Sequence, residues 1–229
     1  MGEPTGDLRA RIVRLGADLF AARGYHGTGL ADLLQAVGVA RGGFYHHFPS
    51  KESVLLEIVS AAIGRILGTS AQIVAQDRDA ATKLRLLCDD LSCAIIDNQP
   101  GFIVFLREYS ALSETAKEQV LALRRTYLER WEQVLHEGAA AGSFTTRQTP
   151  YTEGILGMWI YSFAWNRATV EPQTIASDLA DFVLRGVRSD VLQGPLEAAA
   201  QPAAPPVDLS RRGADAGVTA PRTTEGDVP

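Results

Sequence analysis

The chain has 229 residues, of which 46% are hydrophobic, so it can bury a core without the disulfides or metal ions that much smaller proteins need. Its formal net charge of −5 counts against a protein that binds nucleic acid through a strongly basic surface. Cys88 and Cys93 are the two cysteines, and their spacing fits neither a CxxC redox pair nor a zinc site.

The first helix is predicted from about Asp7 to Arg23. Its apolar residues recur with helical spacing: Leu8, Ile12, Leu15 and Leu19. Gly24 follows, and glycine is the usual residue where a helix ends in the left-handed conformation. We expect this helix to pack under the pair of short helices that comes next.

A helix-turn-helix unit is predicted from Thr28 to Lys51. Thr28 is placed to cap a short helix that ends at Gly38, and that helix has one apolar face: Leu30, Leu33, Leu34 and Val37. After a turn at residues 39–40, a second short helix buries Phe44 and Phe48. It presents six residues outward: Arg41, Gly42, Gly43, Tyr45, His46 and His47. That outward face suits a DNA groove.

Residues 38–52, GVARGGFYHHFPSKE, resemble the recognition helix and the following helix start of the TetR family of bacterial transcription regulators. The motif resemblance covers roughly Leu8 to Ile66. It implies an all-α fold, with a helix-turn-helix DNA-binding domain at residues 1–50 and a helical ligand-binding and dimerisation domain at residues 51–193. It also implies a double-stranded DNA operator as partner, a homodimer, no enzymatic activity and no cofactor.

Four outward residues carry the predicted contacts to DNA. Arg41 is the best candidate for reading a base, because its planar fork can bond both acceptors of a guanine edge. Tyr45, His46 and His47 resemble the family's phosphate-contacting and groove-lining positions. A histidine packed in the core remains the alternative for His47, which precedes Phe48.

Gly42 and Gly43 depart from the family's commoner pattern, which has a hydroxyl residue at one of these positions, and Ala40 replaces its more usual serine cap. A glycine inside a helix costs roughly 0.5 to 1 kcal/mol. The small residues either let the backbone approach the groove closely or leave the helix loose until DNA orders it. We count both glycines among the DNA-binding residues.

Lys51 and Thr28 are predicted to contact phosphate at two helix starts. A cation in the first turn of a helix opposes the helix dipole, so Lys51 is a poor structural choice there unless an anion binds beside it. With Ser50 it makes a phosphate clamp. Thr28 can act likewise through its hydroxyl, and plain capping of its helix is an equally good interpretation.

The negative charge lies away from this unit. Residues 1–60 carry 6 basic and 6 acidic side chains, residues 61–189 carry 13 and 15, and residues 190–229 carry 3 and 6. With few cations near the DNA, affinity has to come from pairing two DNA-binding heads in a dimer, and its salt dependence should be modest for a DNA-binding protein.

The rest of the chain is predicted as further helices and a tail. A long helix from Ser50 links the head to the body, and the helices near residues 150–168 and 172–191 are predicted to form the dimer interface. Residues 194–229 hold 8 Ala, 6 Pro and 4 Gly without an aromatic residue, a composition typical of disorder. Seven apolar side chains are candidates for a ligand pocket, although each can equally be plain core: Phe102, Phe105, Tyr109, Trp131, Met158, Trp159 and Phe163.

The effector is expected to be a small apolar molecule. The C-terminal layout, with Trp131 through Phe144 followed by an aromatic-rich helix, resembles a branch of the family that contains acyl-CoA-responsive regulators of lipid and sterol catabolism. A CoA ester needs cations for its phosphates, and Arg107, Arg124 and Arg125 are near the predicted pocket. Surface ion pairing explains these arginines as well.

Two other classes of protein compete with a regulator. An enzyme would need Cys93 or Cys88 as nucleophile and His136 as base, but no third orienting group, catalytic glycine turn or metal-ligand spacing accompanies them. The second alternative is a helical ligand-binding or interaction protein that has lost DNA recognition, which the neutral head favours. No apolar run reaches the roughly 20 residues of a membrane span, so we expect a cytoplasmic protein without a membrane partner.

Overall fold

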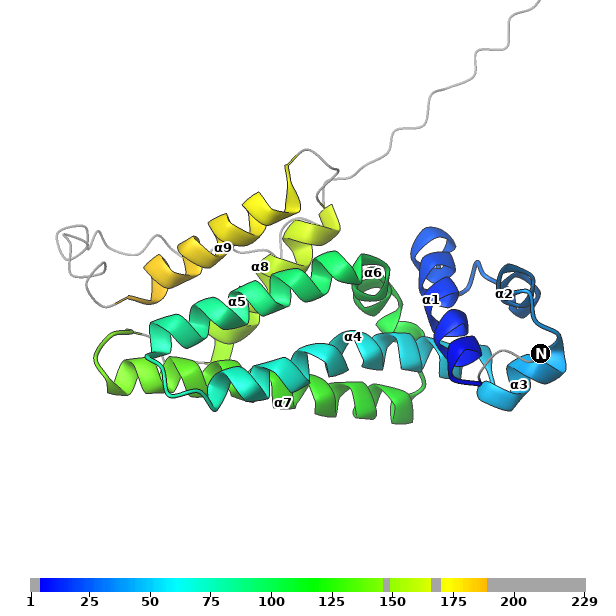
Figure 1. Ribbon diagram of the computed structural model, residues 1–229, viewed down its shortest axis with the longest axis horizontal. Helices are drawn as coiled ribbons and strands as arrows, with labels where there is room; N and C mark the ends of the chain where they lie inside the picture. Colours follow the sequence, from blue (N-terminus) through cyan, green and yellow to red (C-terminus); the bar gives the residue numbers. More distant parts are fainter. Residues whose placement is uncertain (1–4, 146–148, 166–169, 189–229) are drawn as a thin grey trace, which may run out of the picture. The chain divides into compact units, whose positions relative to one another are not determined.

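The computed structural model describes residues 5–145, 149–165 and 170–188, and these form α-helices with no named strand (Figure 1). The all-α prediction is confirmed. The elements are α1 Thr5–Arg23, α2 Leu30–Val37, α3 Arg41–His47, α4 Lys51–Val74, α5 Ala80–Asp97, α6 Gln99–Glu108, the 3-10 turn η1 Tyr109–Ala111, α7 Glu114–Ala140, α8 Thr149–Trp165 and α9 Pro172–Val187. Residues 166–168 and 189–191 of the predicted dimer helices, and the tail from residue 194, lie outside the described residues.

Three helices are followed by a glycine in the left-handed conformation, and the first two of these ends were predicted. Gly24, Gly38 and Gly142 have φ angles of 79°, 71° and 74°. Gly38 also donates its backbone N–H to two carbonyls in the last turn of α2. The glycines therefore set where α1, α2 and α7 stop, because a residue with a Cβ is strained at a positive φ.

Helix α4 is the central element, and it runs from the small helices α1–α3 into the body beside α5 and α7 (Figure 1). Ten of its residues are buried, and it packs against α1, α5, α6 and α7. By length and hydropathy α4 could cross a membrane, so the expectation that no segment reaches that limit was wrong. The same apolar content is what a helix covered on several sides requires, and its packing here is that of a core helix.

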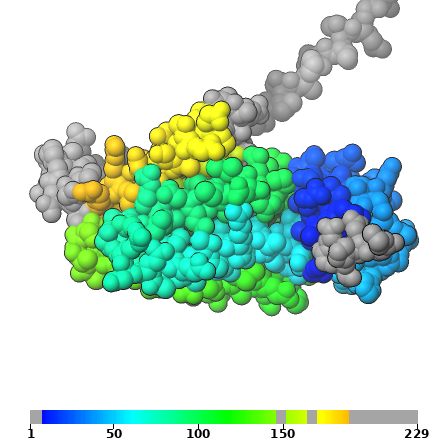
Figure 2. All heavy atoms as spheres, viewed as in Figure 1, coloured from blue at the N-terminus to red at the C-terminus, as the bar shows by residue number. Residues whose placement is uncertain are grey.

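Two apolar clusters lie along α4. The first joins α1, α2, α3 and the start of α4 to residues from α6 and α7, among them Val104, Ala116 and Val120. The second fills the body between α4, α5, α7, α8 and α9. In the space-filling view the atoms of α1 lie directly against those of α6 (Figure 2). The core of the helix-turn-helix thus continues into the body.

The segment after α7 closes the far end of the body. Gly138 of α7 lets the ring of Phe144 lie against the helix, since a Cβ at Gly138 would collide with that ring. The next residue, Thr145, donates its backbone N–H to the carbonyl of Val187 over 2.8 Å. This contact joins the end of α7 to the end of α9.

Candidate nucleic-acid interface and effector cavity

Helix α3 has one buried side and one open side. Phe44 and Phe48 are buried, whereas Arg41 and His46 are exposed and Tyr45 has 49% of its surface free. Among the described residues Arg41 has no hydrogen-bond or ion-pair partner. The structure therefore leaves this guanidinium available for a ligand, as a side chain that reads DNA requires.

The two glycines of α3 have different surroundings. A Cβ at Gly43 would lie 2.7 Å from Cγ2 of Val39, so a side chain there collides with the turn between α2 and α3. A Cβ at Gly42 meets nothing within 4 Å. The close packing of Val39 therefore explains why position 43 holds a glycine, which the sequence alone did not reveal. Gly42 lies on the open face.

Alanine substitutions should separate these two surroundings. Gly42→Ala is expected to stabilise the protein by about 0.5 to 1 kcal/mol, because alanine loses less backbone entropy in a helix. Gly43→Ala should be destabilising, because the branched Val39 has to move. Urea denaturation of the two variants beside the wild type measures both free energies of unfolding. Equal effects of the two substitutions would contradict the close contact at Gly43.

Arg9 of α1 holds the end of α3 in place. Its Nη1 donates to the carbonyl of His47 over 3.1 Å, its guanidinium lies 4.5 Å from the ring centre of Phe48, and its Nη2 pairs with Glu57 of α4 at 2.9 Å. The ring of His47 is partly exposed and packs edge-on against His46. His47 is thus neither a core histidine nor fully open.

Lys51 has partners inside the protein. Its Nζ donates to the carbonyls of Tyr25 and Thr28 over 2.8 and 2.7 Å, and it lies 4.1 Å from the centre of the Tyr25 ring. Partial burial lowers the pKa of the ammonium. The cation therefore ties the first turn of α4 to the loop between α1 and α2, and it escapes the helix dipole by reaching away from its own helix. Its predicted contact with phosphate stays a prediction.

Thr28 does not cap α2, because the N-cap is Gly29, whose N–H bonds the carboxylate of Asp32 over 2.7 Å. The capping prediction was wrong by one residue. The hydroxyl of Thr28 instead donates to the carbonyl of Gly24 over 2.9 Å, and the residue is fully buried. Thr28 would have to become exposed before it could contact DNA.

Glu52 joins the same turn of α4 to the body. Its Oε1 accepts the backbone N–H of Ser113, the N-cap of α7, over 2.8 Å. Hydrogen bonds from Ser113 lower the pKa of this carboxyl group. Lys51 and Glu52 thus connect the start of α4 in two directions, to the α1–α2 loop and to the start of α7.

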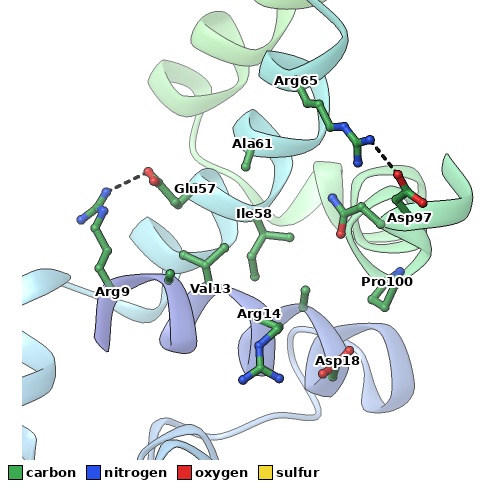
Figure 3. Close-up of a pocket in the computed structure, with 13 residues that line it drawn as sticks. Arg9, Val13, Arg14, Asp18, Glu57, Ile58, Ala61, Arg65, Asp97 and Pro100 are labelled. Atoms are coloured by element: carbon green, nitrogen blue, oxygen red, sulfur yellow. Dashed lines mark hydrogen bonds and ion pairs between the residues drawn. The ribbon is translucent and has the colours of Figure 1, made fainter. Parts of the chain in front are cut away.

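A groove of about 690 Å³ separates α1 from α4 and the corner between α5 and α6 (Figure 3). The close-up shows the Arg9–Glu57 pair and the Arg65–Asp97 pair, with Val13 and Ile58 between them. The four charged side chains keep 40 to 55% of their surface exposed, and such pairs contribute only about 0 to 1 kcal/mol each. Apolar contacts therefore supply most of the attachment of α1 to α4.

Two adjoining cavities of about 250 and 280 Å³ open between α4, α6, α7 and α8. Phe105, Leu106 and Arg124 line both of them. Of the predicted pocket residues, Phe102 and Phe105 line the first and Tyr109 lines the second. Other lining residues were not predicted, because small and aliphatic side chains give no signal in a sequence: Ile63, Ile66, Leu91, Leu156, Gly157 and Ile160.

The remaining predicted pocket residues lie elsewhere. Trp131 and Trp159 are fully buried in the body, and Nε1 of Trp159 donates to Oγ of Ser92 over 2.7 Å. Met158 packs against the same core, and Phe163 lines only a small void of about 10 Å³ beside Phe102. The two tryptophans are therefore core residues in this structure, which was the alternative interpretation of their role.

One arginine reaches the first cavity. Arg124 pairs with Glu153 of α8 at 3.2 Å, and both side chains are partly exposed. Arg107 and Arg125 are exposed and do not line the cavity.

Within the part of the chain that the structure describes, no group of three His, Cys, Asp or Glu side chains could hold a metal ion.

Comparison with known proteins gives matches along most of the described chain. Residues 12–58 match the model of bacterial regulatory proteins of the tetR family, and residues 77–187 match that of the tetracyclin repressor-like C-terminal domain. The HTH-type transcriptional repressor KstR2 of Rhodococcus jostii (strain RHA1) is 31% identical over 137 residues, which cover 59% of this chain and 67% of that protein.

Solved structures show the same arrangement of helices. The TetR family transcriptional regulator PfmR from Thermus thermophilus has a TM-score of 0.71 and 28% identity over 76% of this chain and 97% of its own. AibR, solved in complex with isovaleryl coenzyme A and operator DNA, has a TM-score of 0.69, and the match covers 76% of this chain and 97% of AibR. Its identity of 20% makes that likeness one of fold alone.

Proposed function

We propose a ligand-responsive repressor, since this chain belongs to the TetR family of bacterial regulatory proteins. The family and its named relatives are DNA-binding transcriptional regulators, not enzymes. In the proposal, residues 1–50 bind a palindromic operator, residues 51–193 bind the effector and dimerise, and the effector releases the DNA. TetR regulators are soluble proteins that dimerise, and we place this one in the cytoplasm.

The open face of α3 is the observation that carries DNA binding. Arg41 is exposed and unpartnered among the described residues, and Tyr45 and His46 lie on the same open side. We assign base reading to Arg41, close approach to Gly42 and Gly43, and phosphate or groove contacts to Tyr45, His46 and His47. Two such helices in a dimer would meet half-sites about one DNA turn apart.

Arg41→Ala tests this assignment. Loss of a bidentate base contact should weaken operator binding by about 1 to 3 kcal/mol and relax preference at one base pair. Fluorescence anisotropy with DNA from upstream of the chain's own gene, against a scrambled duplex, measures both effects. Arg125→Ala removes an equally exposed arginine from α7 and serves as control. Equal binding of both duplexes by the wild type would contradict sequence-specific recognition.

The faces of α8 and α9 support the proposed dimer interface. Phe182 and Tyr161 expose 64 and 56% of their surfaces, although they are large and apolar. A Cβ at Gly154, Gly157 or Gly186 meets nothing within 4 Å in this chain. Small residues allow helices of two protomers to approach closely, and exposed aromatic residues supply buried area when they do.

The paired cavities support a small, largely apolar effector, and we favour an acyl-CoA thioester. AibR, which shares the fold, is bound to isovaleryl coenzyme A in its structure. Arg124 lies at the cavity, and its partly exposed pair with Glu153 is weak enough for an anion to replace the carboxylate. Calorimetry with acyl-CoAs of increasing chain length tests this choice, and absence of binding along the whole series would remove it.

The alternative is a helical ligand-binding or interaction protein that has lost DNA recognition. The equal numbers of acidic and basic residues in the first 60 positions favour it, together with the glycine pair in α3. Binding to DNA fragments from the whole genome, selected in repeated rounds, separates the two. Enrichment of one palindromic sequence excludes the alternative.

A further inference from the structure

Among the buried polar atoms of the described body that lack a hydrogen-bond partner of normal geometry, three belong to residues that are almost fully buried. They are Oη of Tyr127, Nε1 of Trp131 and Oγ1 of Thr152, and each belongs to a residue that is at least 97% buried. Buried polar groups are nearly always paired, and an unpaired one costs about 1 to 3 kcal/mol. Three such atoms in one bundle therefore need an explanation.

Two of the three side chains belong to α7 and the third to α8, which pack against each other. Tyr127 and Trp131 are one turn apart on α7, and their ring centres are 6.1 Å apart. Thr152 precedes Glu153, which bonds Arg124, one turn before Tyr127 on α7. Each of the three groups can donate a hydrogen bond.

Tyr127 lies beside the cavity, although its hydroxyl oxygen has almost no exposed surface in this structure. Its side chain lines the cavity of about 250 Å³, whose other walls are almost entirely aliphatic and aromatic. Burial raises the pKa of Tyr127 by more than the neighbouring N–H of Trp131, which can donate to its oxygen, lowers it, so the hydroxyl keeps the proton that it could donate. Arg124 lines the same cavity one turn earlier on α7.

We infer that Tyr127 donates a hydrogen bond to an oxygen atom of the effector, which is therefore an apolar molecule with a carbonyl or hydroxyl group held inside the bundle. The thioester, ketone and alcohol classes meet this requirement, and a pure hydrocarbon does not. This inference rests on the proposed effector cavity, and it adds the chemical group that the cavity selects.

A matched pair of probes tests the inference without DNA. We would titrate the full-length protein with 2-octanone and with octane, by displacement of a fluorescent apolar dye, in the wild type and in Tyr127→Phe. The Kd of 2-octanone should rise about tenfold in Tyr127→Phe, as for the loss of one hydrogen bond, whereas the Kd of octane should stay constant or fall. Equal changes for both probes, no change for either, or no binding of 2-octanone by the wild type would overturn the inference.

Thr126→Val is the control, because it removes a hydroxyl from the adjacent residue of α7, whose side chain is exposed and does not line the cavity. It should leave the ratio of the two Kd values unchanged. A second readout is thermal unfolding without ligand: Tyr127→Phe should melt at the same temperature as the wild type or higher, because it removes an unpaired buried hydroxyl. A lower melting temperature would mean that this hydroxyl is already paired, against the inference. Operator binding by the unliganded protein is a separate assay, so failure of the repressor proposal would be seen independently.

Discussion

Lys51→Met is expected to weaken operator binding by about tenfold or more without lowering the salt dependence of that binding. The ammonium makes two hydrogen bonds to the carbonyls of Tyr25 and Thr28, and bonds of this charge-assisted type contribute about 1.5 to 3 kcal/mol each. Methionine keeps the apolar stem over the Tyr25 ring but has no donor. The loop between α1 and α2 would then lose its attachment to α4, and α3 would lose its orientation.

The salt dependence decides between two roles of Lys51. A lysine that neutralises one phosphate contributes about 0.9 to the slope of log K against log salt concentration. If Lys51 only positions the loop, the slope of Lys51→Met equals that of the wild type. Anisotropy titrations from about 50 to 200 mM salt measure it. A slope reduced by about one would instead establish the phosphate contact that the sequence predicts.

Arg125→Met is the control for charge, because Arg125 is an exposed cation on α7, outside the helix-turn-helix. It should change neither the affinity nor the slope. Unfolding of Lys51→Met followed by circular dichroism checks that the body remains folded. Unchanged operator affinity in Lys51→Met would contradict both roles.

Lys51 and Glu52 also show how ligand binding can reach the DNA. The effector cavity is lined by Val120, Leu121, Arg124 and Tyr127 of α7. The first residues of α7 are bonded to Glu52, whereas the adjacent Lys51 is bonded to the α1–α2 loop. In the proposed repressor, a shift of α7 on ligand binding would therefore be passed to α1–α3 through the first turn of α4.

Local patterns predicted the helices well. Apolar spacing and terminal glycines are properties of neighbouring residues, so the helix ends at Gly24 and Gly38 could be predicted from the sequence. The partners of Lys51 could not, because Tyr25 and Thr28 are 26 and 23 residues away. A cation in the first turn does oppose the dipole of its own helix, but here backbone carbonyls of another segment satisfy it, and no local pattern indicates such distant partners.

The cavity was predicted less well, because helical spacing indicates which face of a helix is buried but not how deep a residue lies. Trp131 and Trp159 are aromatic like Phe102 and Phe105, but they are fully buried in the core. Of the seven candidate residues, three line the two cavities, and their role in ligand binding stays a prediction.

Phe182→Glu is expected to convert the dimer into monomers and to reduce operator affinity by about a hundredfold or more, since two linked heads gain this much from binding together. The apolar residues of α9 lie on two faces. Val183 and Val187 are buried in the body, whereas Phe182 is exposed. Ile175 and Leu179, on the same side of the helix as Phe182, are partly exposed. In a twofold interface each substitution acts twice, and burial of one phenylalanine is worth about 1.5 to 3 kcal/mol. Sedimentation velocity measures the oligomeric state, and anisotropy measures the affinity.

Ser177→Glu introduces the same charge on another exposed side of α9, and it should leave both the dimer and operator binding intact. The ion pair of Asp181 with Arg85 of α5 marks one flank of α9 as already occupied, so a partner has to approach from the flank of Phe182. A Phe182→Glu protein that stays dimeric would move the interface away from this face of α9. A monomer that still bound the operator at full strength would contradict the requirement for two paired heads, because a helix-turn-helix unit with so few cations gains its affinity from the second half-site.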